Sequence, residues 1–257
     1  MREAMCRNLA KKGSWKVVGF DTQAGPLDRL SEDGVMRTSS VEDLVAQSDV
    51  VLLCLPGGNE VRSVTIGDKG LIQWVRKGQT VVDMSTAPPK LMRELEPLFR
   101  AKGADFADAP VARTRRAAVD GTLSIMVGGT ADVFERIRPV LSTMGTEVTH
   151  CGGMGAGQVV KLMNNMVVFE TTMAKGSADS FVLRNHGMKH LVPQDYPEQA
   201  FSVRYAVKDL SYARELARET GVTARAADLV GELFEEAIAR GDGDRYTPVI
   251  RRGMTKS

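Results

Sequence analysis

A lysine and two asparagines stand at helical spacing just after a glycine-rich stretch of this 257-residue chain. Lys161, Asn164 and Asn165 are three and four residues apart, which places them on one face of a helix. A partly desolvated lysine can exchange a proton with an alcohol or carbonyl oxygen, while an asparagine holds the substrate. Gly155 and Gly157 allow a ligand or another part of the backbone to come close. The pattern predicts an acid/base site, and the alternative is a polar helix surface behind a glycine cap.

An arginine-rich turn follows residues 108–111, and it contains Ala112, Arg113 and Thr114. An arginine in a turn after a strand can hold a carboxylate, sulfonate or phosphate through two parallel hydrogen bonds. Arg115 and Arg116 come next, where neighbouring side chains diverge and at least one faces water. The turn therefore predicts an anion-binding role for Arg113, and a solvated basic loop is the alternative.

An acidic residue, Asp21, ends the apolar run at residues 15–20. In dinucleotide-binding folds a carboxylate at this place binds the ribose diol and repels a 2′-phosphate. The residues that follow, 22–26, include no arginine or lysine to offset that repulsion. Asp21 therefore predicts NAD, with NADP less favoured, and the alternative is a simple turn residue.

Polar groups also follow two further apolar runs. Leu55 and Pro56 begin a loop at residues 55–58, and Thr86 ends the segment 83–86. If the runs are strands of a doubly wound sheet, both loops face its ligand crevice. Each could equally be a plain connection from strand to helix. Lys208, in the segment 208–210, is by itself only a charged helix start.

Two kinds of periodicity define the elements that must position these residues. Short apolar runs predict buried strands in the first half, and amphipathic segments at 41–47 and 90–101 predict helices between them. The runs occupy residues 15–20, 50–55, 79–84, 103–107 and 123–127. Such alternation predicts a mostly parallel, doubly wound sheet. After residue 152 the pattern is helical, so we expect a dinucleotide-binding domain at 1–152 and an all-helical domain at 153–257.

Composition excludes several classes of protein. Lys and Arg number 34 against 32 Asp and Glu, so there is no basic surface for nucleic acid. The three cysteines are far apart and lack zinc-ligand spacing, which favours a reducing cytoplasm and no metal site. The longest apolar run, at 50–55, is far shorter than the roughly 20 residues that a membrane helix needs.

In this order the motifs resemble the β-hydroxyacid dehydrogenase family. The matching stretches are MCRNLAKKG, the strand-end Asp21, CLP, DMST, DAPV with GTLSIMVGG, GxGxxxKLMNN and KDL. The resemblance implies an α/β fold with a doubly wound Rossmann-like sheet followed by an all-helical domain. It also implies hydride transfer between a nicotinamide cofactor and a small anionic 3-hydroxy acid or its semialdehyde.

The resemblance assigns roles to residues that are ambiguous alone. It implies that Lys161 is the acid/base and that Asn165 holds the substrate beside it. It further implies a cofactor site lined by Leu55, Pro56, Thr86 and Lys208. We also expect a homodimer or homotetramer.

Two departures from the family concern the length of the chain. Family members usually begin with a strand and G-x-G-x-M-G, whereas Met1 and Arg2 align inside that motif. We therefore expect the first strand of the sheet and its phosphate-binding glycines to be missing, with a loss of stability. The strands beside it must either pair with each other or leave backbone groups unpaired. An internal segment also looks deleted between Glu170 and Lys175.

A third departure lies in the arginine-rich turn. The family pattern P-V-S-G-G is replaced here by Pro110-Val111-Ala112-Arg113-Thr114. Ala112 lacks the substrate-binding hydroxyl, and the G-R-T of sulfolactaldehyde reductase is the closer resemblance. We expect Arg113 to meet an anionic head group.

Two hypotheses compete with an active enzyme. The chain is in one case a catalytically impaired, truncated paralogue that keeps the scaffold and binds a small anion or a partner. In the other it is a structural α/β protein without a ligand. The missing glycine motif favours impairment, whereas the retained Lys161, Asn165, Thr86 and Lys208 favour an active oxidoreductase.

Overall fold

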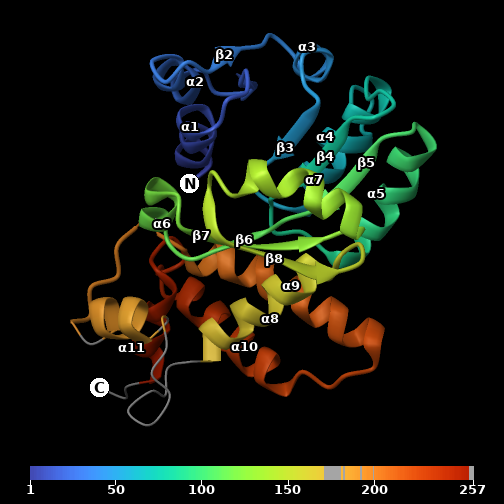
Figure 1. Ribbon diagram of the computed structural model, residues 1–257. Helices are drawn as coiled ribbons and strands as arrows, with labels where there is room; N and C mark the ends of the chain where they lie inside the picture. Colours follow the sequence, from blue (N-terminus) through green and yellow to red (C-terminus); the bar gives the residue numbers. More distant parts are fainter. Residues whose placement is uncertain (171–180, 182, 192, 199, 255–257) are drawn as a thin grey trace. The chain divides into compact units, whose positions relative to one another are not determined.

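The computed structural model describes residues 1–170, 181, 183–191, 193–198 and 200–254 (Figure 1). These residues form two compact units, Met1–Lys161 and Leu162–Ser257. Helix α8 (Ala156–Glu170) contributes to both. The predicted division after residue 152 stays a prediction.

The first unit contains a six-stranded sheet (Figure 1), and the apolar runs at 50–55, 79–84, 103–107 and 123–127 predicted four of its strands. Strands β3, β4 and β5 are parallel neighbours, β7 is antiparallel to both β5 and β6, and β8 is parallel to β7. The bounds are β3 (Val50–Leu53), β4 (Thr80–Asp83), β5 (Asp105–Asp108), β6 (Val111–Ala112), β7 (Leu123–Gly128) and β8 (Gly145–Gly152). The predicted mostly parallel sheet is confirmed.

Helices cover both faces of this sheet. Successive residues of a strand point to opposite faces, and Val81 and Val82 accordingly belong to two different core clusters. In one cluster Phe99 of α5 stacks on Phe106 of β5, with ring centroids 5.0 Å apart. In the other, Ile137 of α7 packs with the β7 residues. The covering helices are α3 (Val41–Ala46), α4 (Gly58–Ile66), α5 (Pro89–Ala101), α6 (Arg115–Asp120) and α7 (Ala131–Leu141), with a 3₁₀ turn at Leu71–Gln73.

The first forty residues form a separate small sheet. Strand β1 (Val18–Gly19) pairs in parallel with β2 (Met36–Arg37), and among the described residues no strand joins this pair to the larger sheet. The flanking strands β1 and β3 therefore do not pair with each other. Helices α1 (Arg2–Lys12) and α2 (Ala24–Ser31) belong to this part.

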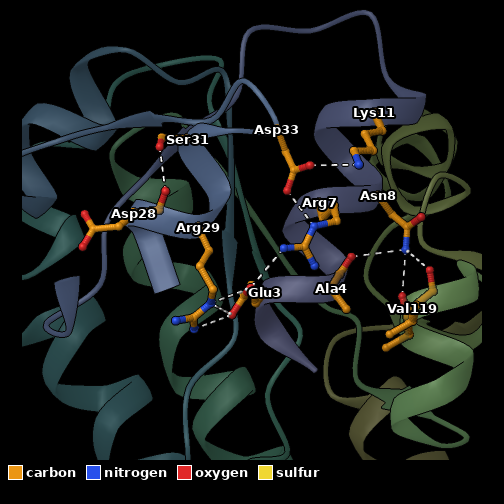
Figure 2. Close-up of polar contacts among 11 residues, drawn as sticks. Glu3, Ala4, Arg7, Asn8, Lys11, Asp28, Arg29, Ser31, Asp33 and Val119 are labelled. Carbon is orange, nitrogen blue, oxygen red and sulfur yellow. Dashed lines mark hydrogen bonds and ion pairs between the residues drawn. The ribbon is translucent and has the colours of Figure 1, made fainter. Parts of the chain in front are cut away.

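Buried Asn8 attaches α1 to the remainder of the unit. Its side-chain amide donates to the carbonyl of Ala118 at 2.7 Å and to that of Ala4 at 3.2 Å (Figure 2). A buried amide must find such partners, because leaving its N–H groups unpaired costs free energy. This contact links α1 to the carboxyl-terminal half of α6.

A network of partly exposed ion pairs connects α1 with α2 and the turn after it. Arg7 lies between Glu3 and Asp33, and Lys11 also pairs with Asp33 (Figure 2). Arg29 of α2 binds both carboxylate oxygens of Glu3. The hydrogen bond from Arg29, supported by Arg7, lowers the pKa of Glu3 to about 2.

The second unit is helical in its described residues. Helices α9 (Val203–Thr220) and α10 (Arg225–Ala239) pack around Leu210 and Phe234, in agreement with the helical pattern after residue 152. Its remaining elements are a π-helical segment (Leu183–Leu191), a 3₁₀ turn (Thr247–Ile250) and α11 (Arg251–Met254), with isolated bridges Glu198–Arg245 and Ser202–Tyr246. The deletion expected after Glu170 falls on residues outside those described. Within the described part, no helix is long and apolar enough to cross a membrane.

Candidate active site

Asp108 holds the amino-terminal end of α8, the helix that carries Lys161. Both carboxylate oxygens of Asp108 accept hydrogen bonds, one from the backbone N–H of Gly155 and one from that of Gln158, each at 2.7 Å. An acceptor at this end satisfies N–H groups that have no partner within the helix, and its charge suits the helix dipole. Strand β5, which ends at Asp108, therefore fixes the first turn of the helix.

The glycines beside this carboxylate are required by close packing. A Cβ atom on Gly157 would lie 2.3 Å from the carbonyl oxygen of Met126, and one on Gly128 would lie 2.3 Å from Asp108 Oδ1. Gly155 has a φ of +84°, which side-chain-bearing residues rarely adopt. The sequence left open whether these glycines admit a ligand or another backbone segment. At Gly157 the neighbour is the backbone of β7.

Burial also affects the ionisation of Asp108, whose side chain is not exposed to solvent. Desolvation raises its pKa to about 6, although the two backbone N–H donors and the charge of Arg93 oppose that rise. The acceptor that holds α8 therefore gains a proton under mildly acidic conditions.

Gln158, fully buried in the first turn of α8, connects the helix to the loop after β4. Its side-chain N–H donates to the carbonyl of Ser85 at 2.8 Å, and its side-chain oxygen accepts from the N–H of Ala87 at 3.1 Å. These two contacts lie on either side of Thr86, which is also buried. Lys161, half-buried, follows Gln158 by three residues on the same helix.

The two predicted cofactor loops contact each other at the carboxyl ends of parallel strands. The N–H of Leu55 donates to the hydroxyl of Ser85 at 2.8 Å, and the N–H of Ser85 donates to Asp83 at 2.9 Å. The loop that begins with Leu55 and Pro56 thus lies beside the loop that contains Thr86. This edge of the sheet is where doubly wound folds bind their ligands.

Asp21 lies two residues beyond β1 and is partly exposed. Its Oδ1 atom accepts a hydrogen bond from the N–H of Gln23 at 2.9 Å, in the turn that leads into α2. This is the turn role that the sequence left open as an alternative. Binding of a ribose by the same carboxylate stays a prediction.

Arg113 occupies a backbone conformation that favours glycine, with a φ of +83°. This explains why the family pattern has glycine where this chain has arginine. The guanidinium donates to the carbonyl of Thr122 at 2.5 Å and lies 3.4 Å from the hydroxyl of Thr146. Thr114 caps α6 by accepting from the N–H of Ala117.

The other members of this turn lie at its two ends. Ala112 is half-buried in β6. Arg116 is largely exposed and pairs with Asp120 at 2.8 Å. The predicted anion-binding residues thus lie in one turn, in which the Arg113 guanidinium donates to the carbonyl of Thr122.

In the second unit, buried Asp209 links two of the predicted site residues. It accepts a hydrogen bond from the side-chain N–H of Asn165 at 2.7 Å and pairs with the ammonium of Lys208 at 3.0 Å. The same ammonium lies 4.0 Å from the centre of the Tyr205 ring. A carboxylate only accepts hydrogen bonds, so it fixes which end of the Asn165 amide faces Asp209.

Asn164 is exposed, and its side-chain N–H lies 3.4 Å from the oxygen of Asn165. Sequence reasoning missed three supporting residues, which are Asp108, Gln158 and Asp209. All three stand inside motifs that were noticed, DAPV, GxGxxxKLMNN and KDL, but Gln158 occupies a position that the motif leaves unspecified.

Two protein-family models match segments of this chain. Residues 1–153 match the family described as the NAD binding domain of 6-phosphogluconate dehydrogenase. Residues 171–251 match the family described as NAD-binding of NADP-dependent 3-hydroxyisobutyrate dehydrogenase.

Individual relatives cover almost the whole chain. The 3-sulfolactaldehyde reductase of Escherichia coli is 30% identical over 95% of this chain and 89% of its own length. The 2-(hydroxymethyl)glutarate dehydrogenase of Eubacterium barkeri is 29% identical over 95% of this chain and 88% of its own. A solved 3-hydroxyisobutyrate dehydrogenase of Mycobacterium tuberculosis, studied with L-serine, has a TM-score of 0.87 at 26% identity, over 100% of this chain and 96% of that one.

The sheet, the helical unit and these matches together define a nicotinamide-dependent oxidoreductase. The chain belongs to the β-hydroxyacid dehydrogenase family, as its motifs predicted.

Proposed function

We propose that this protein transfers a hydride between a nicotinamide cofactor and a small, strongly anionic 3-hydroxy acid or its semialdehyde. The observation that carries the proposal is the attachment of the Lys161 helix to the strand-end loops through Asp108 and Gln158. Such an attachment holds a proton-transferring side chain at a fixed place relative to the predicted cofactor loops. Positioning of this kind is a large part of catalysis.

The residues present fit a dinucleotide. Two loops at the carboxyl ends of parallel strands are hydrogen-bonded to each other through Leu55 and Ser85, and a partly exposed carboxylate, Asp21, follows β1. We assign Leu55, Pro56, Thr86 and Lys208 to cofactor binding, with Asp21 on the ribose. When bound, the nicotinamide ring supplies or accepts the hydride.

The chain itself supplies the proton and the orientation of the substrate. Lys161 donates a proton to the carbonyl oxygen during reduction and removes one from the hydroxyl during oxidation. Asn165 and Asn164 hold the substrate, and the fixed Asn165 amide supports this assignment because Asp209 leaves it only one orientation. An amide that is already oriented loses less entropy on binding.

The anionic head group is assigned to Arg113, with Ala112 and Thr114 beside it. A guanidinium has five N–H donors, and the contacts with Thr122 and Thr146 engage a single nitrogen. The similarity to a protein named 3-sulfolactaldehyde reductase supports a sulfonate, carboxylate or phosphate head.

Three finer assignments accompany this function. Asp21 favours NAD over NADP, since its charge repels a 2′-phosphate. The odd, scattered cysteines favour the cytoplasm. We further propose a homodimer or homotetramer, which sedimentation at several protein concentrations would measure.

The test is an assay of NADH and NADPH oxidation, and of the reverse reaction, over C3 and C4 acids and semialdehydes with the three head groups. We expect a higher kcat/KM for strongly anionic heads. Lys161→Ala should lower kcat by about 10²–10⁴, the usual contribution of acid/base catalysis, with little change in cofactor Kd. Lys69→Ala, at an exposed loop position, is the control. Full turnover by Lys161→Ala would contradict the proposal.

A further inference from the structure

Gln158 is not one of the residues assigned to the cofactor or to the substrate, yet its hydrogen bonds connect the loop that contains Thr86 to the helix that carries Lys161. We infer that Gln158 is a positioning residue that fixes the Thr86 segment against the first turn of α8, so that one side chain affects both cofactor binding and proton transfer by Lys161. The inference rests on the proposed function and adds a residue to it.

Three hydrogen bonds connect Gln158 to two parts of the first unit, the end of β5 and the loop after β4. Its backbone N–H donates to Asp108, at the end of β5. Its side chain donates to the carbonyl of Ser85 and accepts from the N–H of Ala87. The residue is not exposed to solvent, so water cannot readily replace any of the three.

The two side-chain contacts fix a single peptide segment from both sides. Ser85 and Ala87 are the immediate neighbours of Thr86, so the backbone around Thr86 cannot shift without breaking a contact with Gln158. Ser85 also accepts from the N–H of Leu55 through its hydroxyl. A displacement of this segment would therefore extend to the other predicted cofactor loop.

The position of Gln158 on α8 explains why it should also affect proton transfer by Lys161. Lys161 follows by three residues, which is nearly one helical turn. The first turn is held by Asp108 from one strand and by the Ser85 loop from the next, and these strands are parallel neighbours with Asp83 opposite Asp108. Freeing Gln158 from the loop removes one of the two attachments that set the position of Lys161.

Only an amide meets both demands at this place. A glutamine offers N–H donors for the carbonyl of Ser85 and an oxygen for the N–H of Ala87. Gln158→Glu keeps the shape but sets an acceptor against the Ser85 carbonyl. Gln158→Met keeps the approximate length and removes both hydrogen bonds.

Gln79 provides a matched control, because it lies at the start of β4 whereas Gln158 contacts the loop after the end of β4. Gln79 immediately precedes β4, is also buried, and donates to the carbonyls of Val45 and Ser48 while accepting from the N–H of Arg76. Its substitution by Glu or Met removes the same kinds of hydrogen bond. These hydrogen bonds lie at the other end of β4 from Thr86, so their loss should not disturb the predicted cofactor loops.

The experiment compares the Glu and Met variants of Gln158 and Gln79 by urea unfolding, NADH titration by fluorescence, and kcat against pH. We expect comparable losses of stability in both sets. Only the Gln158 variants should weaken NADH binding by about tenfold and lower kcat by about 10- to 100-fold, with a shifted pH profile. Gln158→Asn, which keeps an amide on a shorter side chain, takes the place of any variant that does not fold.

A double variant identifies the route of the effect. In a Lys161→Ala background, Gln158→Met should still weaken NADH binding but should no longer lower kcat, because the residue it positions is gone. Gln158 variants that match the Gln79 variants in Kd and kcat, within twofold, would overturn the inference. Retained turnover in Lys161→Ala alone would instead contradict the proposed function.

Discussion

Asp108 is a buried carboxyl group that stabilises the folded protein more at low pH than at neutral pH, which is the reverse of the usual behaviour of carboxyl groups. Its pKa is raised to about 6 in the folded protein, well above that of an unfolded aspartate. The folded state therefore holds the proton more tightly than the unfolded state does. This contribution to the free energy of unfolding is complete below about pH 4 and is lost as pH rises through about 6.

Asp108→Asn should remove that pH dependence. Relative to the variant, the wild-type free energy of unfolding should fall by roughly 2–3 kcal/mol between pH 4 and pH 7. Urea unfolding at intervals across this range measures the difference. Asp105→Asn removes a carboxylate from the partly exposed start of the same strand and controls for net charge. A constant difference between wild type and Asp108→Asn would refute the assignment.

At the scale of elements, the attachment of α1 depends on one buried amide more than on its many ion pairs. Asn8 donates to three carbonyls, those of Ala4, Ala118 and Val119. Removing it leaves buried acceptors unpaired, which costs about 1–3 kcal/mol. The pairs that Glu3 forms with Arg7 and Arg29 are partly exposed to solvent, and surface pairs contribute about 0–1 kcal/mol.

We therefore expect Asn8→Ala to destabilise the protein more than Glu3→Gln does, as measured by urea unfolding in low salt. Raising the salt concentration to 0.5 M, about three times a physiological ionic strength, should shrink only the Glu3→Gln effect, because salt screens exposed charges. A larger loss from Glu3→Gln, or a salt-sensitive loss from Asn8→Ala, would show that the ion pairs hold the helix.

The elements also show where sequence reasoning succeeds. Continuous apolar runs predicted β3, β4, β5 and β7, since strands covered on both faces need apolar side chains throughout. Strand β8 was missed because it is mostly polar and exposed, and β6 because it has only two residues. The first run, 15–20, forms only Val18–Gly19, and Trp15 is 45% exposed.

In the candidate site, too, the sequence predicted some residues and missed others. Residue types and spacing along one helix predicted Lys161 and Asn165, because helical neighbours lie three and four residues apart. The supports at Asp108 and Gln158 join segments that are 47 to 73 residues apart in sequence. No local pattern encodes such contacts, so only the fold reveals them.

At the scale of the whole molecule, the separate β1–β2 sheet should open more readily than the larger sheet. Its core consists chiefly of Val17, Leu30 and Val35, whereas Val81 and Val82 of β4 are completely buried. Regions with little buried apolar surface unfold locally at lower cost. We expect the N–H groups bonded across β1 and β2 to exchange with solvent at least 100-fold faster than those of β4.

If Asp21 binds the ribose, addition of cofactor should reduce the difference in hydrogen-exchange rate between the β1–β2 sheet and β4. A ligand present at about 100 times its Kd adds about 2.7 kcal/mol to the state that binds it. Exchange at Thr38, whose N–H donates to the carbonyl of Gly19, should then slow by up to about 100-fold when NADH is added. Unchanged exchange at Thr38, alongside slower exchange elsewhere, would place the cofactor away from β1.

The glycines of residues 152–157 differ in how well they should tolerate substitution, which matters for laboratory evolution of this enzyme. A Cβ atom on Gly153 would meet no atom within 4 Å, whereas Gly157 faces a backbone carbonyl at 2.3 Å. Gly152 and Gly155 have positive φ angles, which also disfavour replacement. Libraries that randomise this stretch should vary Gly153 freely and keep the other three glycines, because most clones altered there would be lost before their substrate range could be screened.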